Sequence, residues 1–157
     1  MIITMMLVLV AQSVGFEPLG RNSSGFEEFR NPRDGAVLIR IPEGEFLCGK
    51  EKKTVRLGSY LIGKFEVTNE QFGRFLKETG RKPHAYKEHH DLFSGDTQPV
   101  MFVTTELAGQ YARWAGGRLP SGEEWEKAAR GTDGRTFPWG EDGVPEGATW
   151  PEPLWGD

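Results

Sequence analysis

Residues 111–140 read YARWAGGRLPSGEEWEKAARGTDGRTFPWG and contain the clearest helix signal in the chain. Ser121 is a favoured N-cap residue, and Glu124 three positions later completes a capping box. Gly131 supplies a residue that can end the helix in a left-handed conformation. Apolar side chains recur at the spacing of one helix face, at Trp125, Ala128 and Ala129. The stretch therefore predicts a short amphipathic helix that packs its apolar face against the domain.

Two further helices are predicted upstream. Thr68 and Gln71 form a second capping box, and Gly80 closes the helix that they begin. Its apolar stripe is Phe72, Phe75 and Leu76. Thr104 caps the third helix, which carries an apolar side through Ala115.

Strands are expected between these helices and the N-terminus. Residues 36–41 (AVLIRI) and 46–49 (FLCG) flank turn residues and predict a hairpin. Residues 54–67 alternate apolar and polar side chains, with Gly58 and Gly63 as bends or bulges. Residues 99–103 (PVMFV) predict a short apolar strand.

Residues 111–140 resemble the central signature of the formylglycine-generating enzyme (sulfatase-modifying factor) family, in which WAG-x-RLP-[ST]-x-x-EWE-x-AARG is followed by PWG. The matching residues are 114–121 (WAGGRLPS), 124–131 (EWEKAARG) and 138–140 (PWG). Residues 66–72 (EVTNEQF) resemble a second family run, E-V-T-N-x-[QE]-[YF]. The resemblance covers about 34–140, roughly the first half of the family domain. It implies an α+β, C-type-lectin-like fold that is irregular and loop-rich, with short antiparallel strands and two to three short helices, here truncated.

The length and composition of the chain limit the classes of protein to which it can belong. A chain of 157 residues is long enough for one domain with a core. Its 21 glycines, 10 prolines and 18 aromatic residues suit a loop-rich fold pinned by aromatic side chains. A net charge of −4 without a cluster of Lys or Arg argues against nucleic acid as a partner. The single cysteine excludes an intrachain disulfide.

The N-terminal residues suggest an exported protein. The apolar run 1–11 is too short to span a bilayer and matches the apolar region of a signal peptide, here 1–13, with Ala11-Gln12-Ser13 as the cleavage site. A buried strand or a wrongly assigned start codon are the alternatives, because no Lys or Arg precedes the run. Residues 14–33 are expected to be a linker, and 34–157 the N-terminal portion of the family domain. The predicted localisation is periplasmic or extracellular, with no stable membrane span.

Few residues are candidates for chemistry. Cys48 occupies a position where the family has a core methionine, so a small buried hydrophobe is expected in preference to a reactive thiol. The three histidines lack metal-ligand spacing and are expected in a solvated loop: His84, His89 and His90. Three acidic residues could supply oxygen ligands to calcium but are expected to form a solvated loop: Glu141, Asp142 and Glu146.

No catalytic or cofactor-binding residue is assigned, and the metal is left open. The carboxylates of Glu123, Glu124 and Glu126 are interpreted as cap and first-turn charges. Thr149 replaces an asparagine that the family uses near calcium, so no calcium site is assigned from the resemblance.

The resemblance implies a function for longer family members. Those enzymes oxidise a cysteine of a sulfatase peptide with oxygen, using copper(I) held by two cysteines of the C-terminal half of the domain. These segments are absent from the sequence, so we expect no such activity from this chain alone. Copper and calcium are implied for full-length members, and a sulfatase peptide or another protein as partner; the oligomeric state is left open. The chain is either a truncated piece or a natural short variant, and the alternative function is a non-catalytic, lectin-like binding module of an exported protein.

Overall fold

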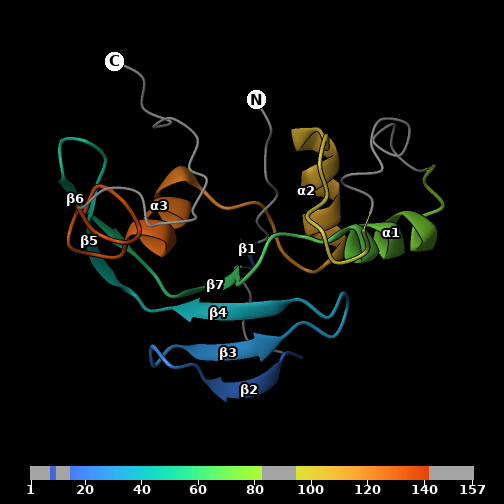
Figure 1. Cartoon of the computed structure of the whole chain (residues 1–157), viewed down its shortest axis with the longest axis horizontal. Helices are drawn as coiled ribbons and strands as arrows, with labels where there is room; N and C mark the ends of the chain where they lie inside the picture. Colours follow the sequence, from blue (N-terminus) through green and yellow to red (C-terminus); the bar gives the residue numbers. More distant parts are fainter. Residues whose placement is uncertain (1–7, 10–14, 83–94, 142–157) are drawn as a thin grey trace.

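The computed structural model describes residues 8–9, 15–82 and 95–141. The elements in order are β1 (Val8–Leu9), β2 (Glu17–Arg21), β3 (Glu27–Arg30), β4 (Val37–Ile41), β5 (Gly44–Cys48), β6 (Lys53–Leu57), β7 (Tyr60–Gly63), α1 (Asn69–Glu78), α2 (Thr105–Trp114) and α3 (Gly122–Arg130). Five strands form one antiparallel sheet in the order β1-β7-β4-β3-β2, and β5 pairs with β6 in a second sheet. Helices α1 and α2 lie toward one end of the larger sheet, and α3 lies beside β5 and β6 at the other (Figure 1). This is the α+β, C-type-lectin-like architecture with short antiparallel strands and short helices that the sequence predicts.

The three predicted helix starts are confirmed. In α1 the Gln71 backbone N–H donates to Oγ1 of Thr68 at 3.3 Å, and the Thr68 N–H donates to the Gln71 side chain at 2.9 Å. In α3 the Glu124 N–H donates to Ser121 Oγ at 3.2 Å, and the Ser121 N–H donates to the Glu124 carboxylate at 2.8 Å. Thr104 caps α2 through one bond, from the Leu107 N–H at 3.2 Å. Each cap satisfies N–H groups that would otherwise lack an intrahelical partner.

The core lies on both faces of β7. Adjacent residues of a strand point to opposite faces. Leu61 accordingly joins the cluster formed with α1 and α2, whereas Tyr60 and Ile62 join a second cluster that includes Ala128 of α3. The first cluster is centred on three aromatic rings whose centroids are 5.4 to 5.7 Å apart: Phe72, Phe75 and Tyr111. Because helices cover both faces, all four residues of β7 are buried.

Strand pairing differs from the sequence expectation. The predicted hairpin over 36–49 is wrong, because β4 pairs with β3 and β7 whereas β5 pairs with β6. The turn at Pro42 to Gly44, where Gly44 has a φ of 143°, redirects the chain from one sheet to the other. The alternating run 54–67 forms two strands, β6 and β7, in different sheets. Residues 99–103 form no strand: Pro99 makes an isolated bridge to Thr68, and Phe102 has a φ of 57°.

The segment expected to be a linker, 14–33, contains two strands of the larger sheet. Strands β2 and β3 form a hairpin, and the Oδ1 atom of Asn22 accepts bonds from the N–H groups of Ser24 and Phe26, both at 3.0 Å. The linker expectation is wrong, because β2 and β3 pair within the larger sheet. The sequence did not reveal β2, because every residue of that strand is exposed. An exposed strand carries no apolar alternation by which a sequence could reveal it.

Part of the predicted signal peptide also pairs with the sheet. Val8 and Leu9 form β1, opposite Ile62 and Leu61 of β7. The rest of 1–13 lies outside the described residues. None of the helices in the described ranges has the length and apolarity to cross a membrane.

Candidate functional site

The inward face of α3 is charged, which differs from the predicted apolar packing. Glu124, Glu126 and Lys127 are 7%, 5% and 3% exposed. The predicted apolar residues of the helix are only half-buried: Trp125, Ala128 and Ala129. Burying charge is costly unless each charge is paired and hydrogen-bonded. We call the three charged residues, with their partners Cys48 and Arg118, the α3 cluster.

Glu126 joins α3 to the end of β5. Its carboxylate accepts bonds from the Gly49 backbone N–H at 2.7 Å and from Cys48 Sγ at 3.2 Å, and it pairs with Arg130 one turn later. Arg130 in turn donates to the backbone carbonyl of Arg135 at 2.6 Å. Glu126 is therefore a fixed acceptor that holds three segments together, and the interpretation of it as a first-turn charge is wrong.

Lys127 holds the turn that carries the chain from the larger sheet into β5. Its ammonium donates to the carbonyls of Pro42 at 2.8 Å and Gly44 at 3.0 Å. Burial lowers the pKa of Lys127, because the low-dielectric surroundings disfavour the charged form. Lys127 thus supplies a donor to a carbonyl on each side of this turn.

Glu124 combines the expected capping role with a buried ion pair. Its carboxylate accepts two bonds from Arg118, at 2.7 and 2.6 Å, in addition to the Ser121 N–H. The two bonds from Arg118 hold the pKa of Glu124 below its usual value. The Glu124 carbonyl also accepts a 2.6 Å bond from the Tyr60 phenol, whose pKa is raised by burial. The helix start is thus tied to β7.

Cys48 is not activated as a nucleophile. Burial and the neighbouring Glu126 carboxylate raise the pKa of its thiol, so it stays protonated near neutral pH. It is half-buried, and the expectation of a buried core hydrophobe misses its bond to Glu126. Nothing in the local sequence signals this contact, because the two residues lie far apart in the chain.

The described residues do not fit a copper site of the family type. Copper(I) prefers thiolate ligands, and a two-thiolate site requires two cysteines. The chain has one, and its thiol donates to a carboxylate. In the described ranges no group of three or more His, Cys, Asp and Glu side chains could hold a metal ion.

The other candidate ligands give no site in the described ranges. Glu141 accepts a 2.8 Å bond from the Thr136 N–H, which lowers the pKa of its carboxyl. It therefore closes the turn that precedes it. The remaining predicted residues lie outside the described ranges: His84, His89, His90, Asp142, Glu146 and Thr149.

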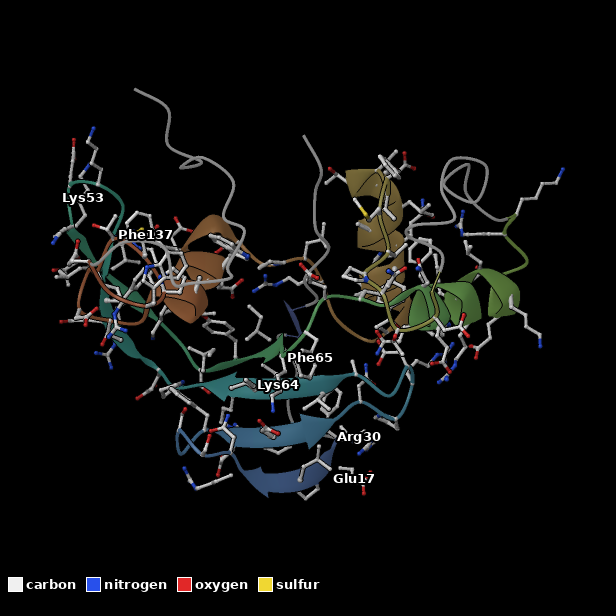
Figure 2. All side chains as sticks on the ribbon, viewed as in Figure 1. Glu17, Arg30, Lys53, Lys64, Phe65 and Phe137 are labelled. Atoms are coloured by element: carbon white, nitrogen blue, oxygen red, sulfur yellow. The ribbon has the colours of Figure 1, made fainter. Side chains whose placement is uncertain are left out.

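A groove of about 560 Å³ lies beside the connector between β7 and α1. Its lining comes from three segments, at 35–37, 63–71 and 97–99. The side chain of Phe65 is 67% exposed at this groove, and Lys64 lies 5.6 Å from its ring centroid. In Figure 2 Phe65 lies above β4 and Lys64 lies over the β4 ribbon, and Lys64 pairs with Glu28 of β3 at 2.8 Å. The mostly apolar lining and the displayed phenyl ring suit binding of an apolar group.

The two sheets, the capped helices and the α3 cluster together form an α+β domain of the C-type-lectin-like class. The model of the sulfatase-modifying factor enzyme 1-like domain matches residues 25–157, and the chain belongs to this family.

The sequence is also similar to proteins that are named as formylglycine-generating enzymes or as an inactive relative of them. The chain is 30% identical to a formylglycine-generating enzyme of Thermomonospora curvata, over 75% of this chain and 57% of the relative. It is 42% identical to a formylglycine-generating enzyme of Mycobacterium tuberculosis, over 70% and 56%. It is 54% identical to the inactive C-alpha-formylglycine-generating enzyme 2 of mouse, over 66% and 51%. The chain spans about half the length of these relatives.

Proposed function

We propose that the chain forms the N-terminal part of a formylglycine-generating domain, whose complete protein oxidises a sulfatase cysteine to formylglycine with oxygen and copper. The observation that carries this proposal is the α3 cluster. It uses the residues of the family signature, at 118–130, to fasten β5 and β7 to one helix. The names of the bacterial relatives support the reaction.

The described residues act in this proposal as a scaffold. Copper(I), when bound to two thiolates, supplies the oxygen chemistry. At least one of the two thiolates would have to come from residues outside the sequence given, because Cys48 is the only cysteine in it. Glu126, Lys127 and Arg118 orient β5, its turn and the start of α3.

An activity assay on the protein encoded by the complete reading frame tests this function. We expect it, when supplied with copper(I) and a cysteine-containing sulfatase peptide, to produce an aldehyde that a hydroxylamine probe labels. Residues 1–157 alone serve as the matched control and are expected to give no aldehyde. Turnover by residues 1–157 alone would contradict the scaffold role. No turnover by a complete protein that has two downstream cysteines would contradict the proposed reaction.

The groove favours a second candidate, a non-catalytic binding module. Phe65 is displayed beside an apolar hollow, and a mouse relative at 54% identity is named as inactive. For this candidate the same sulfatase peptide binds without conversion, and Phe65→Ala weakens binding by about tenfold, as expected for an aromatic contact that is buried on binding. Fluorescence anisotropy measures the affinity, with Phe102→Ala as the control for another exposed phenylalanine. Export, which the run 1–13 predicts, is part of both candidates.

A further inference from the structure

Three charged side chains form a row across β2, β3 and β4. Arg21 of β2 is the register partner of Glu27 of β3, and its Nη2 atom lies 3.2 Å from the Glu27 carboxylate. The same carboxylate lies 3.0 Å from Nε of Arg40 in β4. The β2–β3 turn and the C-terminal end of β4 lie at the same end of the sheet (Figure 1). Two guanidinium groups share one carboxylate, so the row has one positive charge in excess.

A pocket of about 290 Å³ opens beside this row. Both arginines and Glu27 line it, together with the β2–β3 turn and the rings of Phe26 and Pro42. Phe26 is 40% exposed, so its ring is accessible to a ligand. The pocket shares no lining residue with the groove at Phe65. Apolar rings beside two cationic groups suit a small ligand that has both apolar surface and negative charge.

The guanidinium of Arg40 has unused hydrogen-bonding capacity. Its Nε atom is buried, and the N–H does not point at the nearby Glu27 oxygen, so the contact is an ion pair without a hydrogen bond. Among the residues that the structure describes, this guanidinium donates to none. Its Cζ atom lies 4.8 Å from the ring centroid of Phe29, a cation–π contact that fixes the group in place. A guanidinium held in this way presents a fork of donors that matches the two oxygens of a carboxylate.

Arg21 adds positive charge from a fixed position at the hairpin. Its Nη1 atom donates to the Gly25 carbonyl at 2.7 Å, and Nη2 donates to Glu27 at 3.2 Å. A guanidinium has five N–H groups, so these two bonds leave donors for a ligand. One excess positive charge balances a carboxylate, whereas a dianionic phosphate would stay partly unbalanced beside Glu27.

We propose that this pocket binds a small carboxylate that carries an apolar ring. Arg40 holds the carboxylate through its unused donors, Arg21 adds attraction, and the ring lies against Phe26 and Pro42. Glu27 competes with the ligand for the same two guanidinium groups, which limits the affinity. This site is independent of the groove at Phe65 and of the oxidation proposed above.

Titration of the full chain with benzoate, followed by ¹H–¹⁵N NMR, tests the proposal. We expect saturable shifts of the Arg40 Nε–H signal and of the backbone amides of Phe26 and Glu27. Acetate lacks the ring and benzyl alcohol lacks the charge, so each should bind at least about tenfold more weakly. Benzenesulfonate and phenyl phosphate separate a carboxylate from other oxyanions and should bind more weakly than benzoate. Absence of saturable shifts with benzoate, or equal or tighter binding of any of the other four compounds, would overturn the proposal.

Two variants with opposite expected effects distinguish a ligand site from a purely structural row of charges. Arg40→Gln removes the donor fork and should weaken benzoate binding at least about tenfold. Glu27→Gln removes the competing charge and should strengthen binding by about tenfold. Arg56→Gln, in the second sheet and with a side chain that is 66% exposed, is the control and should bind benzoate as the unmodified chain does.

A conservative variant keeps the test decisive if Arg40→Gln fails to fold. Arg40→Lys retains the positive charge but loses the planar fork, so benzoate binding should still weaken. Unchanged or weaker binding in Glu27→Gln would overturn the proposal, because a ligand carboxylate at this place must gain when the resident carboxylate is removed. Unchanged binding in Arg40→Lys would overturn the role of the donor fork.

Discussion

The phenol of Tyr111 in α2 donates a 2.6 Å hydrogen bond to Oδ2 of Asp34, in the loop between β3 and β4. Both side chains are buried, and burial raises the pKa of each. The other oxygen of Asp34 accepts from the Ala36 N–H at 2.9 Å. Asn31 adds a second link, because its side-chain amide donates to the Ala115 carbonyl at 3.0 Å. The loop between two strands is thus fastened to the C-terminal half of α2.

Removal of the phenol should destabilise the fold. Tyr111→Phe leaves a buried carboxyl oxygen without its donor, and we expect the free energy of unfolding to fall by about 1–3 kcal/mol. Tyr60→Phe is the matched control, because the Tyr60 phenol donates to a neutral carbonyl, and its loss should cost only about 0.5–1.5 kcal/mol. Urea denaturation measures both. A larger effect at Tyr60 would contradict the importance given to the Asp34 contact.

Asp34 should make the fold less stable as pH rises. Its pKa is raised in the folded state, chiefly by burial, so the folded protein holds this proton more tightly than the unfolded chain does. The contribution to stability is therefore complete below the unfolded pKa of about 3.9 and is lost as pH rises through the folded pKa. Asp34→Asn should remove this part of the pH dependence. Unfolding free energies between pH 3 and 7 test it; an unchanged slope would contradict the assignment.

Glu124 should have the opposite effect on the pH dependence of stability, because its contribution should be lost as pH falls. Its pKa is lowered by the bonds from Arg118, so its contribution is present above the unfolded pKa of about 4.3 and is lost as pH falls through the folded pKa. We expect Glu124→Gln to cost about 1 kcal/mol at pH 7, a modest value because Arg118 is 48% exposed. The cost should shrink in acid. Measurement of both proteins at pH 7 and pH 3 checks the sign, and a cost that grows in acid would refute it.

Lys127 should be far more sensitive than a surface lysine. Lys127→Met keeps most of the side-chain volume but leaves the Pro42 and Gly44 carbonyls without their donor, so a loss of about 1–3 kcal/mol is expected. Lys53→Met is the control, because the Lys53 side chain is 75% exposed, and it should change stability by less than about 0.5 kcal/mol. Lys53 lies at the outer end of the second sheet in Figure 2. Equal losses in thermal unfolding would count against the buried contact.

Cys48 should react slowly with alkylating reagents. Burial and the Glu126 carboxylate both raise the pKa of its thiol, and only the thiolate reacts. Glu126→Gln removes the negative charge, so we expect it to lower the thiol pKa and speed alkylation at pH 8 by several-fold. The rate measured over pH 7 to 10 gives the pKa, with the urea-unfolded chain as reference. A slower reaction in Glu126→Gln would contradict the effect of the carboxylate.

Much of the helical structure could be predicted because its signals are local. Ser121 with Glu124, and Thr68 with Gln71, are separated by three residues, and the structure shows both capping boxes. The family signature likewise identified the fold, through residues that stand in fixed order along the chain. The pairing of the strands was harder to predict from the sequence. Apolar residues at Val37–Ile41 and at Phe46 predict strands, but no local feature of the sequence indicates that β5 pairs with β6 and not with β4.

The sequence by itself determined where the three helices begin, that one cysteine is present, and that the chain belongs with formylglycine-generating proteins. These properties depend on residue identity and on contacts within one helical turn. The tertiary structure alone decided that Glu126 and Lys127 point inward to Gly49, Cys48 and the Pro42 turn, and that Asp34 meets Tyr111. The physical reason is distance along the chain: a buried charge is tolerated only where donors and acceptors from remote segments converge on it, and this convergence exists only after the sheets and helices have packed.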